Sequence, residues 1–256
     1  MPEITVTAVP AFADNYLWLV STGGSDCADI DPGDAAPVLD ALQRDGLSLS
    51  SILLTHHHAD HVGGVPELVR ATGAEVYGPA DDRIPGPFRR VTEGDTVTLP
   101  ALDMTFRVIE VPGHTATHIA FHGHGCLFCG DTLFSVGCGR LFEGSPEQMQ
   151  ASLDKLASLP PETQVFCAHE YTLSNCDFAR TIEPDNPDLA RRASEVEAHR
   201  AVGRITVPST LAEELKVNPF LRTREPAVVE AARKHDRQAT PGASTLAVVR
   251  ALKDRF

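Results

Sequence analysis

THHHADH, residues 55–61, is the most histidine-rich segment of this chain. It places four histidines and one aspartate within seven residues, directly after the apolar run Ile52–Leu54. Hydrophobic cores seldom gather adjacent imidazoles, whereas zinc takes imidazole nitrogen and carboxylate oxygen as ligands. The stretch therefore predicts a metal site at the end of a strand.

The spacing within the stretch predicts two pairs of ligands. In an extended segment alternate side chains point the same way, so His56 and His58 face one point while His57 faces elsewhere. The chain then turns, which directs Asp60 and His61 at a second point nearby. The two glycines that follow predict a tight approach of the backbone to the site.

A pair of ligands is incomplete, because a hydrolytic zinc site takes three protein ligands and leaves a position for water. Three further candidates follow other predicted strands, where loops place functional groups on a rigid scaffold. The predicted ligand sets are His56, His58 and His114 for one ion and Asp60, His61 and His169 for the other, with Asp131 bridging both.

Other residues of ligand type have a structural interpretation. A lone histidine at a strand end is more often a hydrogen-bonding group than a ligand, and His118 is predicted to support a ligand. For His57, orienting a neighbour and bonding the backbone both stay open. Cys126 and Cys129 lie in an apolar strand and face opposite sides, so we expect them in the core.

The composition is that of a soluble enzyme. The 256 residues are 42% apolar and 22% charged. The opening segment MPEITVTAVP lacks the pattern of a secretory signal, and no apolar run approaches a membrane span. Six irregularly spaced cysteines fit a reducing cytoplasm better than a disulfide framework. We expect a cytoplasmic protein with no membrane partner.

The net charge of −13 opposes a nucleic-acid-binding function. Residues 1–170 carry 8 Lys/Arg against 23 Asp/Glu, a net of −15, and residues 171–256 carry 14 against 12, a net of +2. An anionic ligand would therefore find its cations in the last third of the chain.

Short β-type segments alternate with helical patterns through the first two-thirds, which indicates an α/β arrangement with mixed sheets. Helices are expected near 35–44, 62–72 and 146–158. After the polar joint IEPDNPDL the pattern becomes mostly helical, near 189–202, 226–234 and 245–255. We expect a catalytic domain over residues 1–172 and a small helical domain over residues 173–256.

THHHADH, together with His114, Asp131 and His169, resembles the metallo-β-lactamase superfamily, whose hallmark is H-x-H-x-D-H. The resemblance implies an αββα sandwich of two mixed β-sheets flanked by helices. A closer resemblance is to the hydroxyacylglutathione hydrolases, in the segments DNYLWLV, DPGD, GDTLFSVGCGR, AHEYT, NPFLR and RALKDRF. It extends over nearly the whole chain.

In that family glutathione is held by residues that correspond to Arg140, Tyr171, Arg250 and Lys253 of this chain. Two positions depart from the family pattern, since Arg140 replaces a common lysine and Phe142 stands where a tyrosine can occur. Arg250 and Lys253 are three residues apart on a predicted helix and project on one side. Paired cations suit the carboxylates of glutathione.

The resemblance implies hydrolysis of S-(2-hydroxyacyl)glutathione thioesters, chiefly S-D-lactoylglutathione to D-lactate and glutathione. The expected mechanism uses hydroxide held by two divalent ions, zinc with iron or manganese as alternatives. Asp60 and Asp131 are the expected catalytic carboxylates. The alternatives are another superfamily enzyme, such as a persulfide dioxygenase or a β-lactamase-like hydrolase, and a non-catalytic metal scaffold. We expect a monomer.

Overall fold

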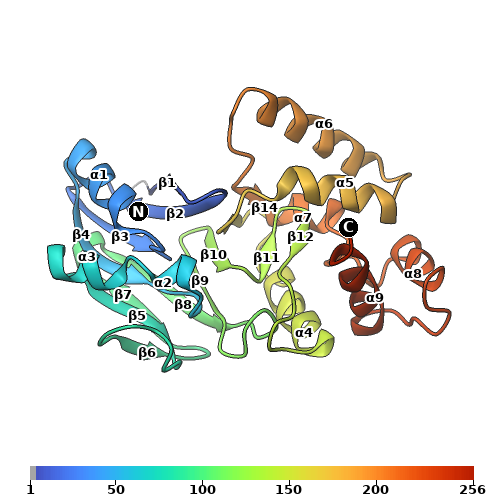
Figure 1. Cartoon of the computed structure of the whole chain (residues 1–256), viewed down its shortest axis with the longest axis horizontal. Helices are drawn as coiled ribbons and strands as arrows, with labels where there is room; N and C mark the ends of the chain where they lie inside the picture. Colours follow the sequence, from blue (N-terminus) through green and yellow to red (C-terminus); the bar gives the residue numbers. More distant parts are fainter. Residues whose placement is uncertain (1–3) are drawn as a thin grey trace. The chain divides into compact units, whose positions relative to one another are not determined.

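The computed structural model describes residues 4–256, and Figure 1 shows the course of the chain. The chain forms two compact units. The N-terminal unit contains the described residues up to Glu110 together with Thr117–Gly130, and the C-terminal unit contains Val111–Ala116 together with Asp131–Phe256. The opening segment, which we predict to lack a secretory signal, begins with residues 1–3, and these lie outside the described residues. The expected domain boundary at residue 172 stays a sequence-based prediction.

The N-terminal unit is built on a six-stranded mixed sheet in the order β1-β2-β3-β4-β5-β6. Its strands are β1 (Thr5–Ala11), β2 (Asn15–Ser21), β3 (Asp26–Ile30), β4 (Ser48–Leu53), β5 (Glu75–Pro79) and β6 (Arg89–Val91). The pairs β1–β2 and β2–β3 are antiparallel, whereas β3 to β6 are parallel neighbours. Parallel neighbours need crossover connections. The helices α1 (Ala35–Asp45) and α3 (Val65–Thr72) lie in the connections from β3 to β4 and from β4 to β5, whereas the connection from β5 to β6, residues 80–88, contains no helix.

Helix α1 has clear start and stop signals. The Asp34 side chain accepts a hydrogen bond from the backbone N–H of Ala36 at 3.0 Å, and Gly46 ends the helix in the left-handed conformation at φ 65°. The buried face of α1 packs in one hydrophobic core with α3 and the sheet. This core includes Val38, Leu42, Val65, Leu68, Leu19, Ile52 and Leu54. This packing fixes the end of β4, where the histidine-rich loop begins.

A second six-stranded sheet has the order β14-β13-β10-β9-β8-β7. Its strands are β7 (Thr96–Leu99), β8 (Met104–Glu110), β9 (Ile119–Gly123), β10 (Cys126–Gly130), β13 (Gln164–Cys167) and β14 (Ser209–Thr210), and the 3-10 turn η1 (Pro100–Leu102) lies between β7 and β8. Strands β7 to β10 are successive antiparallel partners. Cys126 and Cys129 are buried in β10 as expected, and all six cysteines are free thiols.

The C-terminal unit carries most of the helices (Figure 1). They are α4 (Pro146–Ala157), α5 (Thr172–Ile182), α6 (Pro187–Ala201), α7 (Leu211–Val217), α8 (Pro226–Arg233) and α9 (Ala243–Lys253), with the small ribbon β11 (Leu133–Phe134) and β12 (Gly137–Cys138). Helix α5 packs on α6, and α9 packs on α4 and α8. The helical character after residue 171 is confirmed, although α5 and α7 were not anticipated.

Candidate metal centre

The histidine-rich loop follows β4 and ends in the short helix α2 (Ala59–Val62). His58 has an extended backbone, with φ −61° and ψ 145°. His56 and His58 consequently stay on one side, and Nε2 of His56 lies 3.1 Å from Nδ1 of His58. Helix α2 then turns the next pair of side chains, so that Nε2 of His61 lies 3.4 Å from Oδ2 of Asp60. The structure therefore brings together the members of each pair.

Gly63 and Gly64, which follow the loop, allow a close approach to the backbone after β3 rather than the expected approach of backbone to the metal site. A Cβ at Gly63 would lie 2.6 Å from the carbonyl oxygen of Gly33, and a Cβ at Gly64 would lie 2.6 Å from the nitrogen of Ala35. The missing side chains therefore let the loop pack against the segment after β3. The expected helix over 62–72 begins later, at Val65, because Gly64 caps α3 and a proline occupies its first turn.

Asp31, at the end of β3, holds two parts of the loop at once. Its Oδ1 accepts a hydrogen bond from the Thr55 backbone N–H and its Oδ2 one from the Thr55 hydroxyl, both at 2.7 Å. Nδ1 of His61 lies 3.1 Å from the same Oδ2. A carboxylate at Nδ1 fixes the proton there and leaves Nε2 as the ligand nitrogen. Sequence reasoning missed this role, although the DPGD motif that contains Asp31 was the available signal.

Asn15, the first residue of β2, supports Asp60, the carboxylate of the histidine-rich loop. Its Nδ2 donates a hydrogen bond to Oδ2 of Asp60 at 3.0 Å, and the asparagine is buried. The amide thereby restricts the rotation of the Asp60 side chain. This residue was also missed, although it lies in the segment DNYLWLV that carries the family resemblance.

His57 points away from its two neighbours and toward a buried carboxylate. Its Nδ1 lies 3.3 Å from Oδ2 of Asp81. Hydrogen bonds from Arg83, and further ones that include the Thr117 hydroxyl, hold the pKa of the Asp81 carboxyl far below its usual range although burial raises it. Asp81 is therefore an anion that anchors the middle histidine of the loop.

His118 lies against the face of a predicted ligand. Its ring stacks on that of His56, with centroids 4.6 Å apart and 17° between the planes, and its Nδ1 lies 3.0 Å from the carbonyl oxygen of Ile119. Both side chains are fully buried. Among the described residues, His118 is in none of the groups able to hold an ion. The geometry fits a supporting role.

The C-terminal unit carries the three remaining predicted ligands, all buried. Oδ2 of Asp131 lies 3.4 Å from Nε2 of His114, and Oδ1 lies 3.4 Å from Nε2 of His169. The two oxygens of one carboxylate thus face two different imidazoles, which is the arrangement a bridging ligand needs. Nδ1 of His114 is 2.9 Å from the carbonyl oxygen of Arg140, so the opposite ring nitrogen is left for a ligand role.

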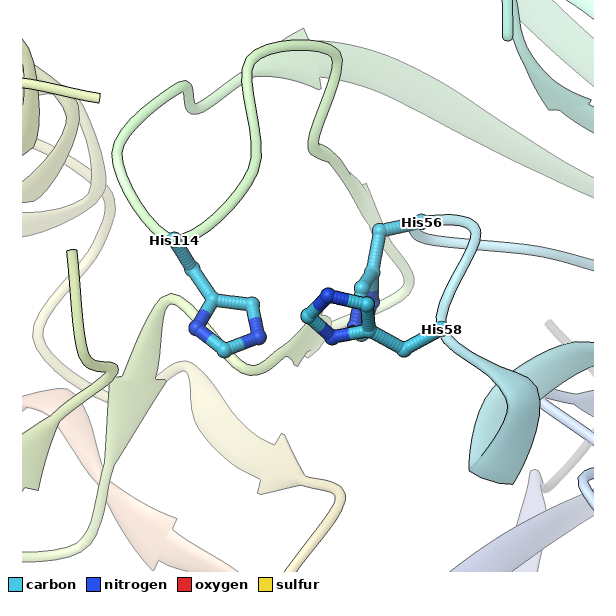
Figure 2. A group of neighbouring side chains, drawn as sticks. All are labelled: His56, His58 and His114. Carbon is cyan, nitrogen blue, oxygen red and sulfur yellow. Dashed lines mark hydrogen bonds between the residues drawn. The ribbon is translucent and has the colours of Figure 1, made fainter. Parts of the chain in front are cut away.

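In the N-terminal unit, the donor atoms of Asp31, His56 and His61 lie within 4.8 Å of one another. Figure 2 shows the imidazoles of His56 and His58, from the loop after β4, and of His114, from the segment after β8. Every donor is an imidazole nitrogen or a carboxylate oxygen. This donor set fits zinc, iron or manganese.

Two of the predicted glutathione residues present exposed surface. The Arg140 side chain is 61% exposed, and its Nε lies 3.5 Å from Oδ1 of Asp254. The Tyr171 ring stacks on that of His169, with centroids 4.7 Å apart and an angle of 4°. Phe142, at the second departure from the family pattern, is exposed and meets His114 edge-on at 5.2 Å. These rings cover two of the predicted metal ligands.

The other two predicted glutathione residues are engaged within the protein. Arg250 is buried and donates from Nη1 to the carbonyl oxygen of Cys138 at 2.7 Å. Nζ of Lys253 donates to the carbonyl and hydroxyl oxygens of Ser174, each at 3.0 Å. Burial, and then the charge of Arg250, lowers the pKa of Lys253 to about 8. Arg250 therefore has a structural function whatever it binds.

Comparison with known proteins assigns the family. The model of the metallo-beta-lactamase superfamily matches residues 12–169, and that of the hydroxyacylglutathione hydrolase C-terminus matches residues 170–256. The hydroxyacylglutathione hydrolase of Pseudomonas fluorescens (strain SBW25) is 52% identical over 256 residues, which are 99% of this chain and 100% of the relative. This chain belongs to the hydroxyacylglutathione hydrolase family. The family that the sequence motifs resembled is thus confirmed.

A second member of the hydroxyacylglutathione hydrolase family, from Nitrosomonas europaea, is 50% identical over 254 residues, with 99% of this chain and 97% of the relative covered. Among solved structures, TTHA1623 in a di-iron-bound form has a TM-score of 0.60 and 31% identity, and the match covers 85% of this chain and 100% of that one. ETHE1 from Myxococcus xanthus, at 23% identity and a TM-score of 0.66 over 98% of both chains, shows the fold alone.

The expected fold class is confirmed by the superfamily model and the solved structures. It is the metallo-beta-lactamase fold, with two sheets flanked by helices and a helical C-terminal region. Within the described residues, no helix has both the length and the apolar composition that crossing a membrane requires.

Proposed function

We propose that the chain hydrolyses S-(2-hydroxyacyl)glutathione thioesters, chiefly S-D-lactoylglutathione, to a 2-hydroxy acid and glutathione. This is the second step of methylglyoxal detoxification. The observation that carries the proposal is the full-length similarity to relatives named hydroxyacylglutathione hydrolase, at 52% identity. A match at both the metallo-beta-lactamase segment and the C-terminal segment favours this activity over other reactions of the superfamily.

We assign His56, His58 and His114 to one divalent ion and Asp60, His61 and His169 to a second, with Asp131 shared between them. The donor groups and the opposed oxygens of Asp131 support this assignment. Two such ions, when bound, lower the pKa of water and polarise a carbonyl group. Zinc suits the donors, and the di-iron form of a 31% identical structure supports iron as an alternative.

The protein's own residues supply orientation. Asp31 contacts the His61 ring and Asn15 donates to the Asp60 carboxylate, so contacts within the protein orient these two donors. His56, His61, His114, Asp131 and His169 are buried, which limits the access of bulk water to these donors and strengthens their electrostatic interactions. A thioester needs no general acid for its leaving group, because a thiol with an ordinary pKa near 8.5 can depart as the thiolate.

Arg140, Tyr171, Arg250 and Lys253 are the proposed glutathione-binding residues, and residues 173–256 the proposed substrate-binding region. The exposure of the Arg140 guanidinium and the positive charge of the Lys253 ammonium support this assignment, because cations attract carboxylates. Arg250 holds the Cys138 carbonyl oxygen, and Arg140 follows two residues later, so we assign Arg250 an orienting role at this turn. We further propose a monomer in the cytoplasm whose partner is the small-molecule thioester.

A substrate panel tests the proposed activity. Thiol release from S-D-lactoylglutathione is measured beside hydrolysis of a chromogenic cephalosporin and oxygen uptake with glutathione persulfide. The prediction is turnover of the thioester at a kcat/KM at least about 100-fold above that for the β-lactam, with no persulfide-dependent oxygen uptake. A preference for either of the other two substrates would assign the chain to a different reaction of the superfamily.

A further inference from the structure

Asp254, which caps the C-terminus of α9, places a carboxylate among the cations assigned to glutathione. Its Oδ1 lies 3.1 Å from Nη2 and 3.2 Å from Nε of Arg250, and 3.5 Å from Nε of Arg140. One oxygen atom therefore faces two guanidinium groups. Both guanidinium groups belong to residues proposed to bind glutathione.

The two arginines of this cluster differ in their freedom to move. The Arg250 side chain is 7% exposed, its Nη1 donates to the Cys138 carbonyl oxygen, and its guanidinium lies 5.2 Å from the ring centre of Phe220. The side chains of Arg140 and Asp254 are 61% and 41% exposed. The solvent-facing part of the cluster is consequently the Arg140–Asp254 pair, which rests on a fixed Arg250.

We propose that Asp254 is a resident carboxylate that occupies the Arg140–Arg250 pair and is exchanged at Arg140 for a carboxylate of the incoming glutathione moiety. This inference rests on the proposed function. Like charges in one site repel, so Asp254 opposes the ligand's carboxylate until that exchange occurs. Asp254 thus lowers the affinity for glutathione and favours its release.

The arginine at position 140 makes such an exchange possible. A guanidinium has five N–H donors in a planar fork, whereas a lysine ammonium is a single compact charge. Asp254 faces Nε of Arg140, so a second carboxylate can approach the outer nitrogens of the same group while the first leaves. A ligand without a carboxylate does not take part in this exchange.

The competing interpretation is a purely structural ion pair, because Arg250 and Asp254 are four residues apart at the end of a helix. Removing the charge of Asp254 would then leave glutathione affinity unchanged or weaken it. The proposal predicts the opposite direction, an increase in affinity. The sign of the change therefore separates the two interpretations.

The experiment is calorimetric titration of the metal-loaded protein with glutathione. For Asp254→Asn we expect the Kd to fall roughly two- to fivefold, the range typical of a partly exposed ion pair. Asp254→Glu, which keeps the charge, should bind like the wild type. Asp185→Asn, which removes the same charge from an exposed segment between α5 and α6, should do so as well.

A second measurement uses a thioester without carboxylates, S-lactoyl-N-acetylcysteamine, whose KM should be the same for wild type and Asp254→Asn. An unchanged or raised Kd in Asp254→Asn, an equal fall in Asp185→Asn, or no glutathione binding at all would overturn the inference. Loss of the proposed function has a different signature, namely wild-type protein that binds glutathione and does not cleave its thioester.

Discussion

Asp31 and His61 are joined through Oδ2 of the carboxylate and Nδ1 of the imidazole, 3.1 Å apart and both fully buried. Thirty residues separate them in sequence, and the parallel pairing of β3 with β4 brings them together. The same carboxylate also holds the Thr55 backbone and hydroxyl. Asp31 is thus positioned to set the orientation of the loop that supplies four of the proposed ligands.

Substituting Asp31 tests this positioning role. Asp31→Asn removes the negative charge and replaces one of the two acceptor oxygens with an amide donor, so the carboxylate that fixes the His61 tautomer is lost and zinc affinity should fall on the order of 10- to 100-fold. Competition with a chromophoric chelator measures the affinity. Asp34→Asn is the matched control, because asparagine caps a helix as well as aspartate does and Asp34 caps α1. Equal zinc affinities in the two variants would show that Asp31 does not position His61 as a metal ligand.

Truncating Arg250 should affect stability as well as binding. In Arg250→Ala the buried Cys138 carbonyl loses its donor, at a cost of about 1–3 kcal/mol in the free energy of unfolding. KM for the thioester should rise, with a smaller change in kcat. Urea unfolding and steady-state kinetics measure the two effects. The exposed Arg255, also at the end of α9, supplies the control, since Arg255→Ala should cost less than about 0.5 kcal/mol. A raised KM without loss of stability would contradict the structural role.

Lys253 should make glutathione binding sensitive to pH. Its pKa of about 8 lies below the ordinary 10.5, chiefly because it is partly buried. The ammonium therefore loses its proton as the pH rises through about 8. The neutral amine no longer attracts a carboxylate electrostatically. KM for S-D-lactoylglutathione, corrected for spontaneous hydrolysis, should rise between about pH 7 and 9. Lys253→Arg, which stays charged, should not show this rise. A KM that does not change with pH in the wild type would exclude a role of the Lys253 charge in binding glutathione.

The sequence predicted the ligand candidates because their signal is local. Alternation in an extended segment separates His57 from His56 and His58, and the observed contacts follow that separation. His114, Asp131 and His169 were predicted from their places after apolar strands, and the two oxygens of Asp131 do face the two histidines. The assignment of these residues to particular ions stays a proposal.

The residues that support the site could not be predicted in the same way. Asp31 and Asn15 meet the loop only through the strand order of the first sheet, which no local pattern encodes. Helix α5 was missed because its sequence, TLSNCDFARTI, mixes polar and small residues, and its helical state depends on packing of Cys176 and Ala179 against α6. The burial of Arg250 could not be predicted for a related reason, because charged side chains are mostly exposed unless the fold provides a partner for them.

Titrating metal back into stripped protein shows whether a two-ion centre cleaves the glutathione thioester. The protein is freed of metal with a chelator, zinc is added in steps, and thiol release from S-D-lactoylglutathione is followed. We expect no activity above background in the stripped protein and a plateau at about two ions per chain. Full thioesterase activity in protein shown by elemental analysis to be metal-free would contradict it.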